Sequence, residues 1–429
     1  MKRKHTKRIG MMPQSTSSWF IFISILGVVL TLISLFVSHG SNFSRIFFKD
    51  TIDVGMDFFH SIEYTKARSP YVLYGTLYPP LANLLFYCLL RFVPEWQLED
   101  WAHTFSDSVA LRTTENDLRV WQSTMFLFIV FLIVSAVLLI LMVQKHFTGM
   151  KEGRKNLIGI CALLSYGVLY GYERGNILIL SMICTMFFVY YKDSKNPLMS
   201  ELALIMLAIG AGLKIYPAVF GAMLIYDKQY AKATRAIIYG VLFFVLPMFI
   251  FHDPWLGFEI FFEKIFKRST VSSFSVDGYG FDNVVNTLVV LISGLIGREV
   301  NEALWLRIVP QWNIIVLVGL LITGFFMKKR WQKTLCCALA MMLYSDQGIY
   351  ATMFFLIPLM NLLQEETVIT KKNFVPFSAL TLSVVLLPIM DAEGAIISYE
   401  YGRYQFCMLL FLGYILVHTA KQMISRYRK

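Results

Sequence analysis

Long apolar runs alternate with short polar segments along almost the whole chain. Between Arg8 and Arg45 there is no Lys, Arg, Asp or Glu, and several later stretches are equally free of charge. A transmembrane helix needs about 20 apolar residues, and fewer where its end lies in a protein cavity instead of lipid. The pattern predicts an all-α polytopic membrane protein with twelve spans: 19–38, 122–144, 157–171, 176–191, 200–213, 216–227, 234–251, 308–327, 334–345, 348–363, 373–390 and 403–420.

Two further apolar stretches, 81–93 and 284–297, are not counted among the spans. If residues 81–93 crossed the membrane alone, every later segment would be inverted and the basic segment 145–155 would lie outside. We therefore predict that 81–93 is a re-entrant or interfacial helix, and we leave 284–297 uncommitted.

Composition and charge agree with this topology. The chain is 57% apolar and 16% charged, which excludes a soluble globular protein and a disordered one. With the amino terminus cytoplasmic, the cytoplasmic side receives 24 of the 39 Lys and Arg but only 6 of the 28 acidic residues. This satisfies the positive-inside rule, so topology accounts for the net charge of +11 and nucleic-acid binding is not expected.

The expected location is the plasma membrane, with both termini cytoplasmic and the lipid bilayer as a constant partner. The strongly basic tails and the absence of a eukaryotic retention signal favour a bacterium. We predict one membrane domain, residues 1–429, with two large external connections at 39–121 and 252–307. Connections longer than about 15 residues usually carry function.

The first external connection contains Asp53, Asp57 and His60 and ends at Tyr78-Pro79-Pro80. Prolines at this point favour an extended segment followed by the start of a helix. Aspartate and histidine in an external loop are candidate acid and base groups. For a lone external histidine, including His252 in the second connection, the alternative is a solvated side chain.

Lys214 is the one charge between Glu201 and Asp227, at the tip of a predicted hairpin. Each arm spans about 18 Å, which is short of the roughly 30 Å of hydrocarbon. A lone cation below the outer surface is costly unless it faces water or an anion, so Lys214 is a candidate site residue. The alternative is a lysine that extends to the surface from a short hairpin.

Two other short hairpins place Glu173, Arg174, Asn176 and Asp346 at external tips. An arginine and a lysine beneath an outward-facing cavity suit a phosphate, the arginine as a bidentate donor and the lysine as a point charge. A carboxylate opposite them suits a general base. The alternatives are a structural salt bridge for Arg174, to Glu173 or another acid, and a hydrogen-bonded turn for Asp346.

Several motifs in a fixed order carry a resemblance to a known family. The chain resembles the GT-C polyprenyl-phosphate-sugar glycosyltransferases, and most closely glycosyltransferase family 87, whose members are bacterial mannosyltransferase-like enzymes. The resemblance covers residues 45–250 and, more weakly, 280–286 and 343–358. Its motifs are Asp57-Phe58, Tyr78-Pro79-Pro80-Leu81, Arg174-Gly175-Asn176 and Gly212-Leu213-Lys214-Ile215-Tyr216-Pro217.

The resemblance implies a GT-C fold whose first external loop holds a catalytic aspartate. By position Asp57 matches that aspartate, and Asp53 is the reserve candidate. The donor would be a hexose, mannose-like, on polyprenyl phosphate, and the acceptor a lipid-linked or cell-envelope glycan. Asp57 would act as general base in an inverting transfer, while Lys214 and Arg174 stabilise the leaving lipid phosphate. No metal and no cofactor are expected.

Further residues are candidates for substrate contact, and one departure from the family leaves the donor sugar open. Family members commonly have Gly-Gln where this chain has Gly175-Asn176. The candidates are His60, Tyr78, Glu173, Asn176, Tyr216, His252 and Asp346.

Two rival functions fit the same pattern of spans. A polysaccharide polymerase or ligase would favour external cations in a late loop, and Lys264, Lys267 and Arg268 lie in the second connection. A transporter or flippase of lipid-linked glycans would place charges along a path through the membrane. The candidate charges here map to one side, which favours the transferase.

The topology makes a direct prediction about accessibility. Cysteines introduced at Glu99 and Glu152 are expected to react with membrane-impermeant reagents from opposite sides of the membrane. The measurement is maleimide labelling of intact cells and of inverted vesicles. Labelling of both positions from the same side would contradict the predicted convergence of charges on the external face.

Overall fold

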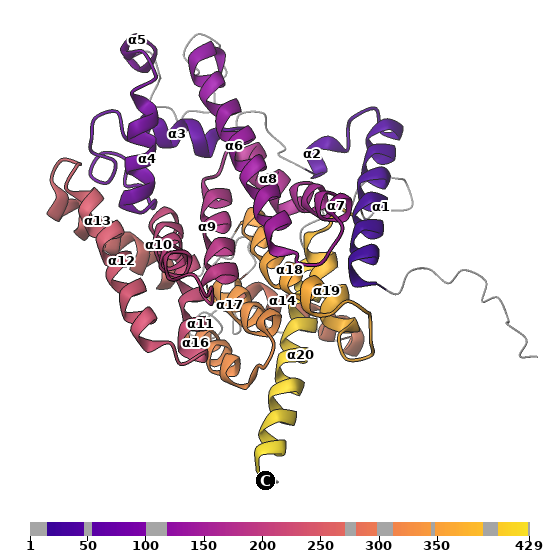
Figure 1. Cartoon of the computed structure of the whole chain (residues 1–429). Coiled ribbons are helices and arrows are strands. Elements are labelled where there is room, and N and C mark those ends of the chain that lie inside the picture. Colours follow the sequence, from indigo (N-terminus) through magenta and orange to yellow (C-terminus); the bar gives the residue numbers. More distant parts are fainter. Residues whose placement is uncertain are drawn as a thin grey trace, which may run out of the picture.

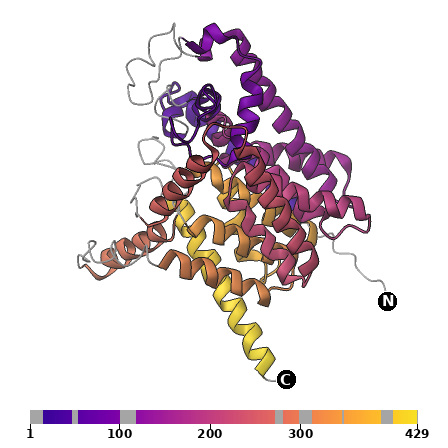
Figure 2. The same ribbon diagram turned by 90° about the vertical axis from the view of Figure 1, so that its left-hand side faces the viewer.

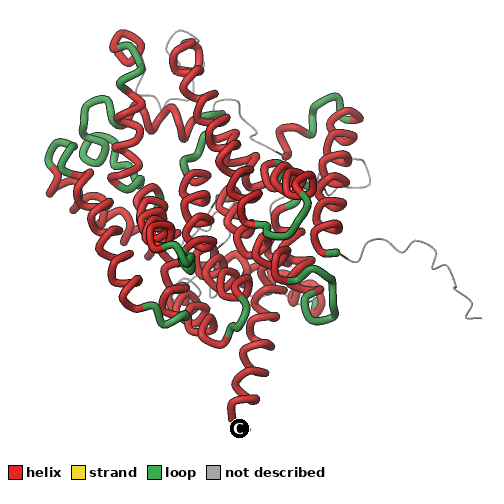
Figure 3. The backbone as a smooth tube through the Cα atoms, in the orientation of Figure 1, coloured by secondary structure: helices red, strands yellow, loops and turns green. Residues whose placement is uncertain are grey.

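The computed structural model describes residues 15–46, 54–99, 118–270, 280–297, 312–344, 348–388 and 402–427. Within these ranges every regular element is a helix, and no strand occurs (Figure 3). The predicted all-α class is therefore confirmed for the described part of the chain.

Among the residues that the structure describes, four helices are long and apolar enough to cross a membrane. They are α1 (Thr16–Val37), α6 (Gln122–His146), α12 (Tyr230–Met248) and α20 (Gly402–Tyr427). Much of their apolar surface faces outward, as expected for lipid contact. In Figures 1 and 2, α20 extends beyond the body of the molecule at the lower end.

The other predicted spans coincide with shorter helices. Many are enclosed by protein: in α17, every side chain from Trp331 to Leu343 except Lys333 is buried. A helix sheathed by other helices does not need the full thickness of the bilayer. Twelve spans were predicted, and four helices meet the length criterion. The shorter helices are α7 (Glu152–Leu163), α8 (Tyr166–Arg174), α9 (Leu178–Tyr191), α10 (Pro197–Leu213), η4 (Tyr216–Gly221), α11 (Ala222–Tyr226), α16 (Asn313–Thr323), η6 (Gly324–Phe326), α17 (Arg330–Tyr344), η7 (Ile349–Phe355), α18 (Leu356–Glu365) and α19 (Phe374–Val384).

The predicted span 157–171 is not one continuous helix. It is split between α7 and α8 at Ser165, whose backbone is extended (φ −69°, ψ 147°). The break lets α8 pack closely on η7, since a Cβ on Gly167 would lie 2.7 Å from the backbone nitrogen of Met353. Tertiary packing thus overrides the continuous apolar pattern.

The first external connection forms short helices at the upper end of the molecule (Figure 1). As the prolines predict, α4 begins at Pro80, and its 11 residues span about 16 Å, too short to cross a bilayer alone. The second connection contributes two further helices. The elements of both connections are α2 (Phe43–Ile46), α3 (Met56–Tyr64), α4 (Pro80–Leu90), α5 (Glu95–Glu99), η3 (Leu118–Val120), α13 (Pro254–Thr270) and α14 (Phe281–Ile296).

The connections predicted to share the cytoplasmic side meet on one face of the structure. Hydrogen bonds and ion pairs join the loops after α6, α9, α11, α16 and α18 and the start of α1. The joining pairs are Gln364–Thr148, Thr16–Glu366, Lys329–Glu366, Arg330–Asp193, Lys333–Asp227 and Gln229–Asp193. The tips at Arg174 and Lys214 lie at the opposite ends of their helices. The basic loops that were predicted to share one side therefore lie together on one face of the structure.

Candidate functional site

Helix α3 holds Asp57 beside a cluster of packed aromatic side chains. The helix begins after Gly55, whose left-handed backbone (φ 73°) turns the chain into its first turn. The Gly55 N–H donates to the carbonyl of Glu173 at 2.6 Å, which joins the start of α3 to the end of α8. Phe58 and Phe59 are fully buried, and Phe58 packs against Phe128. Burial of these rings fixes the face on which Asp57 is presented.

The carboxylate of Asp57 is held by two side chains from the turn between α8 and α9. Arg174 donates from Nε to Oδ2 and from Nη2 to Oδ1, each at 2.9 Å. Asn176 donates from Nδ2 to Oδ2 at 2.6 Å. This is the bidentate geometry that gives arginine–carboxylate pairs their orientation. The Asp57 and Arg174 side chains are 17% and 23% exposed, so the pair remains accessible from one side.

This geometry changes the role expected for Arg174. The sequence predicts that the bidentate edge of the Arg174 guanidinium binds a lipid phosphate, with a salt bridge to an acid as the alternative. In the structure that edge contacts Asp57. Arg174 therefore orients the carboxylate, and Lys214 becomes the principal candidate for an anionic group of the substrate.

Gly175 and Asn176 shape the turn that brings these groups together. Gly175 has φ 65°, and a Cβ there would lie 2.7 Å from Cβ of Phe58 and 2.8 Å from a ring atom of Phe128. Asn176 is buried, and its Oδ1 accepts the N–H of Leu178 at 2.9 Å. Because Oδ1 is engaged with the backbone, Nδ2 faces Asp57. This gives a physical reason for asparagine at the position where the family commonly has glutamine.

Lys214 and three tyrosines form a second part of the site. The chain leaves α10 at Leu213, and Nζ of Lys214 lies 4.1 Å from the ring centroid of Tyr78, a cation–π distance. Burial raises the pKa of Tyr78 well above its ordinary value, and the nearby charge of Asp57 adds to this. The nearby hydroxyls of Tyr216 and Tyr350 raise the pKa of Tyr78 as well. The site therefore brings together α3, the segment before α4, η4 and η7.

His60 lies behind Asp57 on α3 and is buried. Burial, together with the nearby charges of Arg174 and Arg119, lowers its pKa to about 2. The imidazole is therefore neutral at physiological pH and stacks on Tyr64, with 6.2 Å between ring centroids. His60 is therefore an uncharged polar group behind Asp57.

Three residues were missed by sequence reasoning. Glu63 is buried one helical turn beyond His60, and its charge helps burial to raise the pKa of Tyr64 to about 12. Arg119 donates a hydrogen bond to the carbonyl of Val54 at 3.0 Å. Tyr350 lies near Tyr78 and helps to raise its pKa. The i, i+3 spacing from His60 was the available signal for Glu63, whereas Arg119 and Tyr350 had no comparable signal.

The remaining candidates are dispersed. Glu173 contributes its carbonyl to Gly55, and its side chain is half-buried. His252 is exposed, and its backbone N–H donates to the carbonyl of Arg68 at 2.8 Å. Asp53 and Asp346 lie outside the described residues.

The fold and the site together define a helical membrane protein with a polar, carboxylate-centred site at one end of its helices. A model of glycosyltransferase family 87 matches residues 76–345, which is more than half of the chain, and the protein belongs to this family. The resemblance drawn from the sequence motifs is thereby confirmed. No curated protein and no solved structure matches the chain.

The matched range includes most of the site but begins after α3. Tyr78, Arg174, Asn176 and Lys214 lie within it, whereas Asp57 precedes it. The hydrogen bonds from Arg174 and Asn176 thus connect Asp57 to the part of the chain that carries the family pattern.

We expect Gly175→Ala to destabilise the protein by more than the strain of an alanine at positive φ alone would. The added methyl meets Phe58 and Phe128, so α3 must shift relative to α8. Gly149→Ala is the matched control, because its φ of 73° imposes similar strain with nothing within 4 Å of the added Cβ. Thermal unfolding in detergent should show a larger loss for Gly175→Ala, by about 1–3 kcal/mol. Equal losses would contradict the close approach of α3 and α8.

We expect His60 to make stability depend on pH. Its pKa is about 2 in the folded chain against the ordinary 6.5, so below pH 6.5 the unfolded chain binds more protons and stability falls as pH falls. Acidification from about pH 7.5 to about pH 5 should cost about 2 kcal/mol through this residue. His60→Gln should therefore reduce the decrease in Tm between these pH values.

The exposed His252 supplies the control for this measurement. His252→Gln should leave the decrease in Tm equal to that of the native chain. If His60→Gln and His252→Gln behaved alike, His60 would not be the buried neutral group described above.

Proposed function

We propose that this protein is a hexosyltransferase that moves a mannose-like sugar from polyprenyl phosphate to a lipid-linked or cell-envelope glycan. The site would face the outside of a bacterial plasma membrane, with both termini cytoplasmic. The observation that carries the proposal is the carboxylate of Asp57, which Arg174 and Asn176 hold, together with the cation of Lys214 over the ring of Tyr78. Family membership supplies the glycosyl-transfer chemistry.

In the proposed step, Asp57 acts as general base. Its carboxylate takes the proton from an acceptor hydroxyl while that oxygen attacks the anomeric carbon of the donor. The bond between the anomeric carbon and the phosphate oxygen breaks, and its electron pair leaves with the lipid phosphate. Attack opposite the leaving group inverts the anomeric configuration. A positioned base of this kind contributes roughly 10²–10⁴ in rate.

The surrounding residues have separate roles in this step. Arg174 and Asn176 orient the carboxylate, because three hydrogen bonds leave it little freedom to rotate. Lys214 stabilises the charge that develops on the departing phosphate, at the tip of its hairpin. Tyr78 and Tyr216 border the same space and would contact the sugar or the phosphate. The step as proposed uses protein groups alone, without metal or cofactor.

The polymerase or ligase alternative rests on cations in the second external connection. Lys264 of that connection donates to the carbonyl of Gly75 at 2.8 Å, so it holds two external segments together. The flippase alternative requires charges along a path, whereas Asp57, Arg174 and Lys214 gather at one end of the helices. Both observations favour the transferase.

We expect Asp57→Asn to abolish transfer. The amide cannot accept the acceptor proton, and the rate should fall about 10²–10⁴-fold. Asp253→Asn is the control, because Asp253 is an exposed aspartate in the second external connection. The measurement is the cell-surface glycan composition, by mass spectrometry, in cells carrying the native chain or either variant at matched expression.

The glycan profile distinguishes the possible outcomes. Loss of one sugar or one glycan in Asp57→Asn, with a native profile for Asp253→Asn, would support the proposal and identify the product. An unchanged profile in Asp57→Asn would remove Asp57 as the base. Asp53 would then be tested, followed by the polymerase and flippase alternatives.

A further inference from the structure

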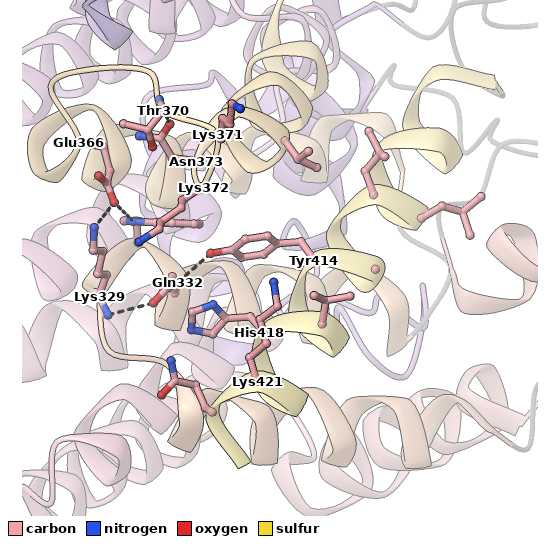
Figure 4. A pocket seen from close by; sticks show the side chains of 17 residues that line it. Lys329, Gln332, Glu366, Thr370, Lys371, Lys372, Asn373, Tyr414, His418 and Lys421 are labelled. Carbon is pink, nitrogen blue, oxygen red and sulfur yellow. Dashed lines mark hydrogen bonds and ion pairs between the residues drawn. The ribbon is translucent and has the colours of Figure 1, made fainter. Parts of the chain in front are cut away.

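A cavity lies at the end of the molecule opposite Asp57. It has a volume of about 970 Å³ and is bordered by the start of α17, the loop after α18, the first turn of α19 and one side of α20 (Figure 4). The loop belongs to the predicted cytoplasmic face, because Thr16 at the start of α1 donates to the carbonyl of Glu366 at 2.5 Å. Nothing in the proposed transfer step uses this cavity.

The charged groups around the cavity are strongly biased toward lysine. Four lysines and a single acid, Glu366, are among the described residues that line it, a net charge of +3. Glu366 already forms an ion pair with Lys329 and accepts a hydrogen bond from Trp331. The other lysines, Lys371, Lys372 and Lys421, are exposed at the rim. The rim therefore presents an excess of positive charge to an anion.

The wall along α20 changes from apolar to polar toward its carboxyl end. Leu409, Leu410 and Val417 form its apolar stretch, and His418, Lys421 and Gln422 follow toward the carboxyl end. From Leu409 to Gln422 the wall is about 20 Å long. This length is enough to accommodate a headgroup together with the upper part of an acyl chain.

Exposed apolar side chains continue this wall outward. Val375 on α19 and Val417 on α20 are 41% and 55% exposed, as expected for contact with lipid. Tyr414 stacks on Trp331, with 5.7 Å between ring centroids, and its hydroxyl accepts a hydrogen bond from Gln332 at 2.8 Å. Trp331 is itself buried, so this pair forms the inner wall of the cavity.

We propose that this cavity binds an anionic phospholipid of the cytoplasmic leaflet. Lys371, Lys372 and Lys421 bind the headgroup phosphate, and the acyl chains lie along Leu410 and Val417. Basic cavities between transmembrane helices on the cytoplasmic side suit such headgroups, because the leaflet is rich in anionic lipid. The amphipathic lining distinguishes this ligand from a water-soluble phosphate, which gains nothing from the apolar wall.

The test is native mass spectrometry of the full chain in detergent with added phosphatidylglycerol. The native chain should retain the lipid, and the triple variant Lys371→Gln, Lys372→Gln, Lys421→Gln should bind it more weakly. We expect about fivefold weaker binding for each lysine and roughly a hundredfold for the three together. Phosphatidylcholine should bind the native chain more weakly than phosphatidylglycerol.

Two further variants make the result specific. The variant Lys151→Gln, Arg154→Gln, Lys195→Gln removes the same charge from exposed positions elsewhere on the predicted cytoplasmic face and should bind the lipid like the native chain. Gly413→Leu keeps every lysine but fills part of the cavity, where a Cβ meets nothing within 4 Å, and should also weaken binding.

Several results would overturn the proposal. Equal lipid loss in the two triple variants would show that net charge alone attracts the lipid. Equal binding of phosphatidylcholine would show an apolar groove without headgroup recognition. Displacement by inorganic phosphate alone would indicate a soluble anion, and a strong preference for a long-chain polyprenyl phosphate would indicate the isoprenoid carrier. None of these results depends on Asp57, so failure here is distinct from failure of the proposed transferase.

Discussion

The contact on which the site depends is the bidentate pair between Asp57 and Arg174, completed by Asn176. It joins a short helix of the first external connection to the turn between α8 and α9. The Gly55 N–H reinforces this junction through the carbonyl of Glu173. Removing either charged partner would leave the other in a largely buried position, which is costly. This contact fixes the orientation of α3 and therefore the packing of Phe58 against Phe128.

The two ends of the molecule use charge in different ways. At the end opposite the site, the side chain of Lys192 is fully buried and forms ion pairs with Asp193 and Asp227, and Lys333 pairs with Asp227 as well. Burial alone would raise the pKa of Asp227, but its two lysine partners hold it below the ordinary value. That network ties loops together. At the site, Asp57 remains 17% exposed, which the proposed role as a base requires.

Much of the candidate site was visible in the sequence, since Asp57, Arg174, Asn176 and Lys214 stand out as charged or polar groups at the tips of apolar segments. Their mutual contacts were not visible. Arg174 was assigned to phosphate because an arginine fork suits either a phosphate or a carboxylate, and only proximity decides between them. Arg119 and Tyr350 were missed because they lie in elements whose packing no local pattern reports.

The sequence by itself determined the helical class, the family and the grouping of the basic loops on one face. Apolar length and the distribution of lysine and arginine depend on local composition, so they can be read along the chain. Only the tertiary structure decided the break between α7 and α8 and the pairing of Asp57 with Arg174, which lies 117 positions away. Such contacts depend on backbone turns and on the packing of distant helices, and neither has a signature within a single segment.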